Sequence, residues 1–262
     1  MTAENQVDHT IYTLDETVKF CLSQLDGDLN FYDAIAEPND GSGNFLNHIN
    51  HDNEVSFNYL LPTTNAFQVG RLEESRRVLV LGNPPFGTHS QLSRRLLKHV
   101  SSLGNVQTIA MILPDTYNKH TLQRQVDPIF RLKSVTKLPA NSFMRHGEYY
   151  DAPCSFFVFD KSAGPCLRFR AEEHKDTPHF SFGSEQDHDF FVIGAAPHNI
   201  KPKSGRHNRG HYIKVKPCVD IEQVKQNFKR FDWHGFSAVT GGVFWLNQAE
   251  LAQQYKAHLE QE

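Results

Sequence analysis

One stretch of the chain decides the fold: residues 77–87, which read RVLVLGNPPFG. The run Arg77–Leu81 predicts a buried strand, because short apolar runs rich in Val and Leu are typical of strands covered on both faces. After the turn, apolar residues from Leu92 to Val100 recur at the spacing of one helix face. A strand that passes through a tight turn into a helix is the repeating unit of an α/β fold.

A second unit of the same kind lies upstream. The apolar run Phe31–Ala36 predicts a strand, and it is followed by residues 37–45, which read EPNDGSGNF. Leu46 and Ile49 predict a helix that begins near Gly43. Strand, glycine-rich turn and helix in this order open a nucleotide-binding α/β unit.

Other strands and helices alternate around these two units. A capping-box pattern at Thr13–Glu16, followed by apolar residues at helical spacing, predicts a first helix. The alternation predicts an α/β fold with a doubly wound, mostly parallel sheet that helices cover on both faces. The remaining predicted strands are Val55–Leu61, Ala66–Val69, Val106–Leu113, Ser134–Leu138 and Ser155–Phe159.

The alternating pattern weakens after Lys161. We therefore divide the chain into a core, residues 1–161, and a substrate-facing extension, residues 162–262. The extension holds a run of six cations with no Asp or Glu between Phe190 and Val219. Such a run favours contact with the phosphates of a nucleic acid, although an exposed, solvated loop is the alternative. The expected phosphate contacts are Lys201, Lys203, Arg206 and Arg209, and the run continues to Lys214 and Lys216.

Composition narrows the functional classes. The 262 residues carry a net charge of −3, so attraction to nucleic acid has to come from a local patch. No apolar run approaches the roughly 20 residues that cross a bilayer, so no membrane contact is expected. The first ten residues lack the basic and apolar segments of a secretory signal. Four scattered cysteines without a C-x-x-C pair indicate a reduced, cytoplasmic setting and no metal site.

The glycine-rich turn has the features of a ligand loop. Gly41 and Gly43 permit positive φ and a close approach of backbone to a ligand. The helix expected behind them directs free N–H groups to the same place. The carboxylate of Glu37 suits a cofactor that carries a sulfonium or an amino group better than it suits a phosphate. The alternative is a turn that only connects strand and helix, since two glycines are a weak signal.

The segment Asn83–Phe86 carries a more specific signal. Two prolines fix two φ angles and remove two backbone donors, and the residue before each proline is held extended. The carbonyls of Asn83 and Pro84, together with the Asn83 amide oxygen, form a rigid cluster of neutral acceptors. Such a cluster suits the two N–H donors of an aromatic amine, and Phe86 offers a flat apolar face for a base. A tight turn after a strand is the alternative.

These motifs resemble those of the γ-type amino-methyltransferases, the family of N6-adenine-specific DNA methyltransferases found in phages and bacteria. Asn83–Phe86 is similar to their catalytic tetrapeptide, and Glu37–Phe45 is similar to their cofactor loop. Thr13 with the helix behind it resembles the segment that closes over the cofactor. Further similarity extends over residues 10–161, and it includes Ile112–Pro114, Asn141–Phe143 and Asp151–Cys154.

The resemblance implies a Rossmann-like fold of the S-adenosylmethionine-dependent methyltransferase type. It implies a flipped adenine whose N6 amine donates to the Asn83 side chain and the Pro84 carbonyl while Phe86 stacks on the base. Pro85 completes the catalytic tetrapeptide. The implied cofactor residues are Thr13, Glu37, Pro38, Asn39, Asp40, Gly41, Gly43, Asn44, Phe45 and Asn58.

The chain departs from the family pattern in two places. Family members carry an acidic residue at the end of the second strand to bind the cofactor ribose, and here Asn58 or Tyr59 stands there. They also often carry an Asp near the cofactor adenine, where this chain has Gly70 or Arg71. These changes predict weak cofactor binding or the need for a partner subunit.

Four functions remain open on the sequence. Methylation of adenine N6 in DNA comes first, and the same reaction on RNA uses the same four residues. Methylation of a protein glutamine ranks lower, because such enzymes usually carry Tyr in place of Phe86. The fourth is a degenerate subunit that binds nucleic acid and supports an active partner. Outside the motifs, we expect Asp115 to cap a helix and Trp233 and Trp245 to lie in a core.

Overall fold

The computed structural model has two compact units, Met1–Arg168 (unit 1) and Phe169–Glu262 (unit 2). Their boundary falls a few residues beyond the division at 161/162 made from the sequence. The structure describes residues 11–38, 44–57, 74–86, 90–168, 175–204, 207–233 and 245–260.

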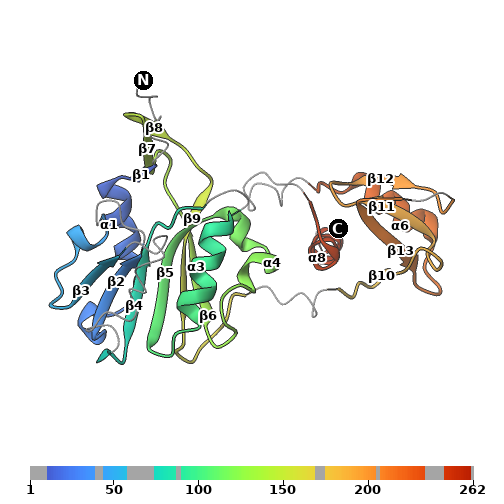
Figure 1. Cartoon of the computed structure of the whole chain (residues 1–262). Coiled ribbons are helices and arrows are strands. Elements are labelled where there is room, and N and C mark those ends of the chain that lie inside the picture. Colours follow the sequence, from blue (N-terminus) through green and yellow to red (C-terminus); the bar gives the residue numbers. More distant parts are fainter. Residues whose placement is uncertain are drawn as a thin grey trace, which may run out of the picture. The chain divides into compact units, whose positions relative to one another are not determined.

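Unit 1 is built on a six-stranded sheet in the order β3-β2-β4-β5-β9-β6 (Figure 1). The pairs β2–β3, β2–β4 and β4–β5 are parallel, whereas β9 runs antiparallel to both β5 and β6. The predicted mixed α/β fold with a mostly parallel sheet is therefore confirmed. The strands are β2 (Ala34–Pro38), β3 (Glu54–Phe57), β4 (Val78–Gly82), β5 (Val106–Pro114), β6 (Arg131–Lys137) and β9 (Cys154–Asp160).

Helices cover both faces of this sheet, because its strands alternate apolar side chains to either side. Helix α3 (Gln91–Ser101) lies across one face, where Leu96 and Leu97 pack with Val80 (Figure 1). Helix α1 (Asp15–Ser23) covers the other face, where Val18 and Cys21 pack with residues such as Leu81. The presence of helices on both sides of the sheet follows directly from this alternation.

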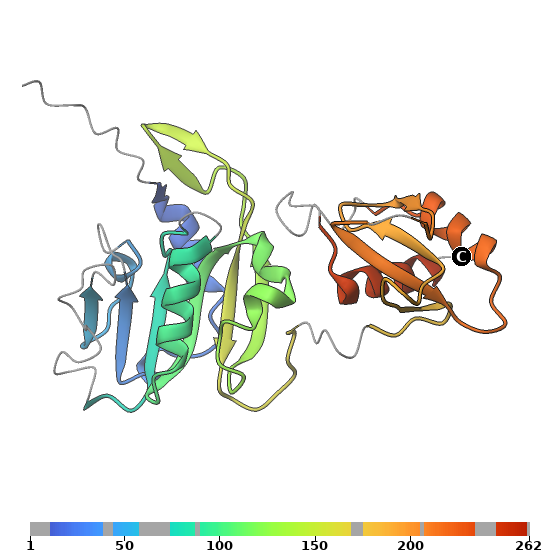
Figure 2. The same cartoon turned by 45° about the vertical axis from the view of Figure 1, so that its right-hand side comes forward.

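A small three-stranded sheet extends from the end of the main sheet at which β4 and β5 finish (Figure 2). Its strands are β1 (Tyr12–Thr13), β7 (Phe143–Arg145) and β8 (Glu148–Tyr150), in the order β1-β7-β8. Pairing of Thr13 with Phe143 joins the start of the chain to the hairpin that follows β6. The other short helices in the described part of unit 1 are η1 (Leu29–Phe31), η2 (Leu46–His48), η5 (Asp115–Asn118) and α4 (His120–Gln123).

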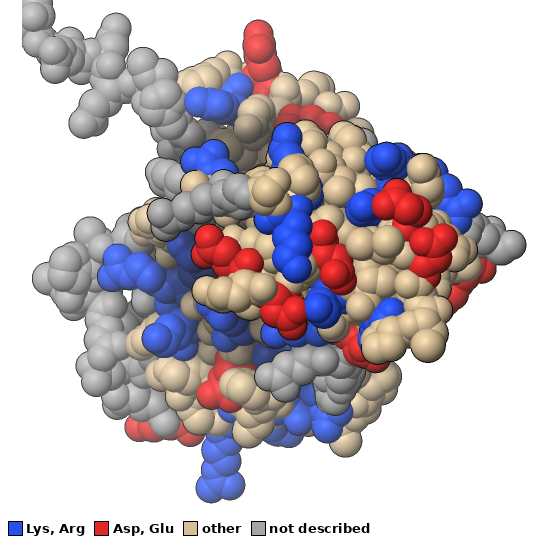
Figure 3. Space-filling model, turned by 90° about the vertical axis from the view of Figure 1, so that its right-hand side faces the viewer, with Lys and Arg blue, Asp and Glu red and all other residues tan. Residues whose placement is uncertain are grey.

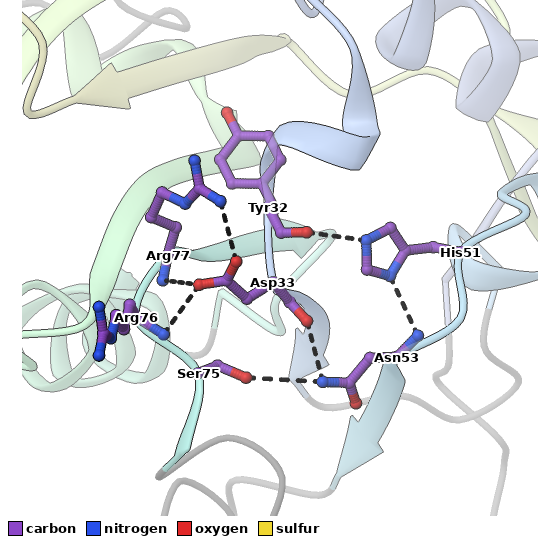
Figure 4. A network of polar contacts seen from close by, with 7 residues as sticks. All are labelled: Tyr32, Asp33, His51, Asn53, Ser75, Arg76 and Arg77. Carbon is purple, nitrogen blue, oxygen red and sulfur yellow. Dashed lines mark hydrogen bonds and ion pairs between the residues drawn. The ribbon is translucent and has the colours of Figure 1, made fainter.

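At the opposite end of the main sheet, a polar network ties together the starts of β2, β3 and β4 (Figure 4). The Asp33 carboxylate accepts hydrogen bonds from the backbone N–H of Arg76 and Arg77 and from the Arg77 guanidinium, each at 3.0 Å. Asn53 donates to the Asp33 carbonyl at 2.9 Å. His51 Nδ1 accepts from the Asn53 N–H, so its Nε2–H donates to the Tyr32 carbonyl. The network fixes where three strands begin.

Unit 2 is a four-stranded antiparallel sheet in the order β10-β13-β11-β12, with α6 and α8 on one face. Its core is mainly aromatic: Phe180, Phe190, Phe228 and Tyr255 are all buried. The elements are β10 (Phe180–Phe182), β11 (Phe190–Ile193), β12 (Ala196–Lys201), β13 (Gly210–Val215), α6 (Ile221–Arg230) and α8 (Gln248–Leu259).

Three local predictions were wrong. The capping box at Thr13–Glu16 does not form: Leu14 is the N-cap, without a side-chain cap bond, because Thr13 belongs to β1 and its hydroxyl binds elsewhere. The helix expected from Gly43 is only the single turn η2, which ends before Ile49. The strand expected from Phe31 begins at Ala34, because Phe31 lies in η1 with its ring half-exposed beneath the Arg77 guanidinium.

Two predicted strands fall partly or wholly outside the described residues. Only the first part of Val55–Leu61 is described, as β3, and Ala66–Val69 is not described. The expected burial of Trp233 is confirmed, since 1% of this residue is exposed. No helix within the described ranges combines the length and apolar composition needed to cross a bilayer.

Candidate functional site

The order of the strands marks one place for a ligand. The chain passes from β2 outward to β3 on one side, and then from β4 to β5 on the other side. In open α/β sheets ligands bind outside the carboxyl ends of the strands at such a reversal. Here that place lies beyond Pro38 at the end of β2 and Gly82 at the end of β4. Both loops that the sequence marked as functional begin there.

Glu37 and Gly82 lie against each other at this point. A Cβ added to Gly82 would stand 3.4 Å from Glu37 Cγ, and Gly82 has a φ of +147°, which side-chain-bearing residues rarely adopt. The positive φ of Gly82 therefore lets the chain turn into the Asn83–Phe86 segment, and the short distance shows that Gly82 lies directly beside the Glu37 side chain. This close approach places Glu37, where the glycine-rich loop starts, beside Gly82, which directly precedes the Asn83–Phe86 segment.

The Glu37 carboxylate organises the far end of the glycine-rich loop. Glu37 is 5% exposed and accepts hydrogen bonds from the N–H of Phe45 at 3.1 Å and of Leu46 at 3.0 Å. These bonds bind the strand end to the residues that follow the loop. A buried carboxylate held by neutral N–H donors also favours a positive charge nearby. The residue thus shapes the loop and suits a cationic ligand.

Of the predicted cofactor residues, the structure brings together Thr13, Glu37, Pro38, Asn44 and Phe45. The Asn44 amide donates to the Thr13 carbonyl at 3.4 Å, and Phe45 is fully buried beside Glu37. Loop residues Asn39, Asp40, Gly41 and Gly43, together with Asn58, lie outside the described residues.

The segment Asn83–Phe86 follows β4 as an extended strand end. Pro84 is buried, and Asn83, Pro85 and Phe86 are half-buried. The Phe86 carbonyl accepts from the Leu92 N–H at 3.1 Å, which links the segment to the start of α3. The Phe86 ring packs partly against the core on the α1 face, so only part of it is open for stacking.

Among the described residues, only the nitrogen end of the Asn83 side-chain amide has a hydrogen-bond partner. Its Nδ2 donates to Thr13 Oγ1 at 2.9 Å. Its Oδ1 is buried, and among the described residues no donor lies within hydrogen-bonding distance of it. Leaving a buried acceptor unpaired costs free energy, so an unpaired acceptor at a ligand position indicates a group that binds an incoming donor.

Asp115 has a different role from the helix cap expected for it. It is 1% exposed at the end of β5, where its carboxylate accepts from Ser155 Oγ at 2.7 Å and also binds the Lys137 ammonium. Sequence reasoning did not single out Ser155 and Lys137, which face each other across the β6–β9 pair. The signal that reveals them is strand register, because both lie where β6 ends and β9 begins.

The basic run of unit 2 is divided by the structure. Lys214 pairs with Asp187, and Lys216 pairs with Asp176 at 2.8 Å, so acidic residues from outside the run neutralise these two lysines. Among the predicted phosphate contacts, Lys201 shares a face of the sheet with Tyr212, Arg209 directly precedes β13, Lys203 is exposed, and Arg206 lies outside the described residues. On the face in Figure 3, basic side chains lie among acidic ones.

No three His, Cys, Asp or Glu side chains of the described ranges gather as metal ligands. No family model matches the chain. No curated protein matches it in sequence. Among solved structures, TrmN from Thermus thermophilus is similar with a TM-score of 0.35 and 15% identity, over 55% of this chain and 48% of that chain. The match thus spans about half of TrmN, and at this level it indicates no shared function.

Proposed function

We propose that the chain transfers a methyl group from S-adenosylmethionine to the N6 amine of adenine in DNA. The observation that carries the proposal is the unpaired, buried Oδ1 of Asn83 in an Asn-Pro-Pro-Phe segment at the strand reversal. A neutral acceptor with no donor of its own suits an amine that has N–H groups to donate.

The proposal includes a fold of the Rossmann-like S-adenosylmethionine-dependent type for unit 1. Its support is the doubly wound sheet, with both functional loops at the carboxyl ends of adjacent parallel strands. Glu37, Asn44 and Phe45 would hold the cofactor, together with the glycine-rich loop. When bound there, S-adenosylmethionine supplies an electrophilic methyl group on a positively charged sulfur, and the buried Glu37 carboxylate favours that charge.

The residues of the chain act on the adenine. Its N6 amine donates one N–H to Asn83 Oδ1 and the other to the Pro84 carbonyl, which pulls electron density onto the nitrogen and directs its lone pair. As the nitrogen forms its bond to the methyl carbon, the carbon–sulfur bond breaks, and one N–H proton then passes to solvent. The exposed part of Phe86 stacks on the base. The contribution of the protein is positioning and hydrogen bonding to charge that develops on nitrogen.

The polymer is proposed to contact unit 2 through the cations of the basic run that form no salt bridge among the described residues. Lys201, Lys203 and Arg209 meet this description, and Arg206 lies in the same segment. Lys203 forms no salt bridge, although its charge also acts on Asp187, the partner of Lys214. Contacts of this type bind the phosphate backbone without reading sequence. Tyr212 lies on the same face of the unit 2 sheet as Lys201, so its ring would lie close to the phosphate backbone that Lys201 contacts.

The test is methyl transfer from labelled cofactor to DNA and to RNA of matched sequence, followed by nucleoside analysis. The proposal expects labelled N6-methyl-2′-deoxyadenosine from the DNA, and only a small residual amount of it with Asn83→Ala. Product found only as the ribonucleoside would move the substrate to RNA. No product with either polymer, from protein that binds DNA, would overturn the enzymatic function in favour of a supporting subunit.

A further inference from the structure

We infer that Thr13 is a positioning residue that fixes the orientation of the Asn83 amide. The inference rests on the proposed function, because it concerns the same site. It also changes the role expected for Thr13, which the sequence resemblance placed at the cofactor. The observation behind it is the hydrogen bond from Asn83 Nδ2 to Thr13 Oγ1.

The two ends of an asparagine amide have opposite chemistry, since Nδ2 only donates and Oδ1 only accepts. Rotation by half a turn would present two N–H donors to the adenine amine, and that arrangement is repulsive. The threonine oxygen, 2.9 Å from Nδ2, accepts one of these hydrogens. In this arrangement Oδ1 points away from Thr13, as the buried acceptor that an amine requires. A hydroxyl could also donate to Oδ1 of the rotated amide, but Nδ2 would then meet the N–H groups of the adenine amine. The Thr13 hydroxyl and the bound amine together therefore select the observed orientation.

Thr13 can fix Asn83 because Thr13 is itself fixed. It is 6% exposed and pairs with Phe143 in the β1–β7 ladder. The next residue, Leu14, donates its N–H to the Ser142 carbonyl at 3.1 Å. The same carbonyl accepts from Thr17 Oγ1 at 3.1 Å. A short strand and the first turn of α1 are thus anchored to one point of the hairpin segment.

Thr13 also connects to the glycine-rich loop, because its carbonyl accepts from the Asn44 amide. One residue therefore contacts the loop proposed for the cofactor, the hairpin segment at Ser142–Phe143 and the catalytic amide. Any shift of β1 would move the Thr13 hydroxyl and release the Asn83 amide. This arrangement makes the orientation of Asn83 dependent on an ordered N-terminal strand.

The decisive variants are Thr13→Val and Thr13→Ser. Valine keeps the branched shape and the β1–β7 pairing but removes the acceptor, whereas serine keeps the hydroxyl. A misplaced catalytic group costs on the order of 10²-fold in rate. We expect a loss of this order in kcat for Thr13→Val, with the KM for DNA and the cofactor affinity unchanged, and recovery of most of the rate in Thr13→Ser.

Thr17→Val is the matched control, since it removes a threonine hydroxyl that binds the same hairpin but not Asn83. Its kcat should fall far less than that of Thr13→Val, because Thr17 supports β1 only through the hairpin and does not touch the Asn83 amide. A second control is the Asn83→Ala background, in which Thr13→Val should cause no further loss. Equal losses of kcat in Thr13→Val and Thr17→Val, or a normal kcat in Thr13→Val, would overturn the inference.

A readout that needs no turnover separates this inference from the proposed function. In protein labelled with ¹⁵N at asparagine side chains, the Asn83 amide hydrogens should exchange slowly with solvent in the parent. They should exchange slowly in Thr13→Ser and fast in Thr13→Val. This pattern in a parent without methyl transfer would retain the inference and reject the enzyme. Equal exchange in parent and Thr13→Val would reject the inference even if the parent is active.

Discussion

The two units of the chain place their polar side chains in different ways. In unit 1 the strands carry buried apolar residues, mostly aliphatic apart from the phenylalanines of β9, and polar groups gather where strands begin or end, as at Asp33 and Asn83. In unit 2 the core consists mainly of aromatic rings, and charged residues such as Lys214 stand along the strands and pair with carboxylates. Under the proposed function, this difference assigns the methyl-transfer chemistry to the fixed strand ends of unit 1 and the contact with DNA to the charged surface of unit 2.

The prediction with the largest expected effect tests the chemistry proposed for unit 1. Replacing Asn83 by Ala removes the unpaired acceptor and should lower kcat on the order of 10²- to 10³-fold. DNA affinity should stay unchanged, because the proposed phosphate contacts belong to unit 2. Steady-state kinetics together with DNA binding measure both quantities. Near-normal turnover in this variant would remove Asn83 from the mechanism.

The prediction with the next largest effect tests the DNA contacts proposed for unit 2. Changing Lys201, Lys203, Arg206 and Arg209 to Gln should weaken DNA binding and flatten its dependence on salt. The slope of log affinity against log salt falls by about 0.9 for each phosphate that the protein no longer neutralises, or up to about 3.6 for four.

The matched control for this variant is Lys214→Gln with Lys216→Gln. These lysines belong to the same run but are paired with Asp187 and Asp176, so their replacement should change the slope little. Equal slopes for the parent and the fourfold variant would identify the run as a solvated loop. The substrate surface would then have to be sought around Arg145 and His146.

A smaller effect concerns the two ends of the unit 1 sheet. The Arg77 guanidinium and the N–H groups of Arg76 and Arg77 lower the pKa of Asp33. A carboxyl whose pKa is lower in the folded state stabilises the protein above its unfolded pKa, and that contribution is lost as pH falls through the folded value. Asp33→Asn should therefore lower the melting temperature by a few degrees at neutral pH and reduce its acid dependence.

Scanning calorimetry across pH checks this prediction, with kcat measured below the melting range. Because the Asp33 network lies at the end of the sheet opposite Asn83, kcat should stay near that of the parent. A large loss of kcat without a change in melting temperature would mean that the two ends of the sheet are not separate in function.

The smallest effect concerns thiol reactivity in the two units. Burial raises the pKa of Cys21 and of Cys154 in unit 1 to about 12, so both remain protonated thiols. Cys218 in unit 2 is exposed, and Cys166 is half-buried. Iodoacetamide should label Cys166 and Cys218 in the folded protein and all four cysteines after unfolding, as mass spectrometry would show. Rapid labelling of Cys154 would indicate that the start of β9 opens.

The strands of unit 1 could be predicted because apolar runs such as Val78–Leu81 and Val106–Leu113 have few alternatives once buried on both faces. The same pattern predicted the two loops that follow these strands, but not the strand order that brings Glu37 beside Gly82. The bond between Thr13 and Asn83 could not be predicted, since it joins residues 70 positions apart and depends on β1 pairing with β7. The Thr13 hydroxyl therefore makes this long-range contact in place of the N-cap bond that the local pattern predicted.

The ion pairs that Lys214 and Lys216 form with carboxylates could not be predicted from the sequence for a similar reason. Their partners, Asp187 and Asp176, lie outside the run that looked free of acidic residues, and only the antiparallel sheet brings them close. The strands of unit 2 are short and its core depends on contacts between distant aromatic residues, so local periodicity carried little information. The positions of the strands could therefore be predicted from the sequence in unit 1 but not in unit 2.

Both tryptophans of the chain, Trp233 and Trp245, belong to unit 2. Trp233 is buried against Phe228, with its ring N–H bound to the Phe228 carbonyl at 2.9 Å. Its emission should therefore lie at short wavelength and shift to the red when unit 2 unfolds. Unit 1 contains no tryptophan and will not contribute to this signal. Tryptophan fluorescence, excited selectively over tyrosine, thus follows the unfolding of unit 2 alone, without any engineered probe.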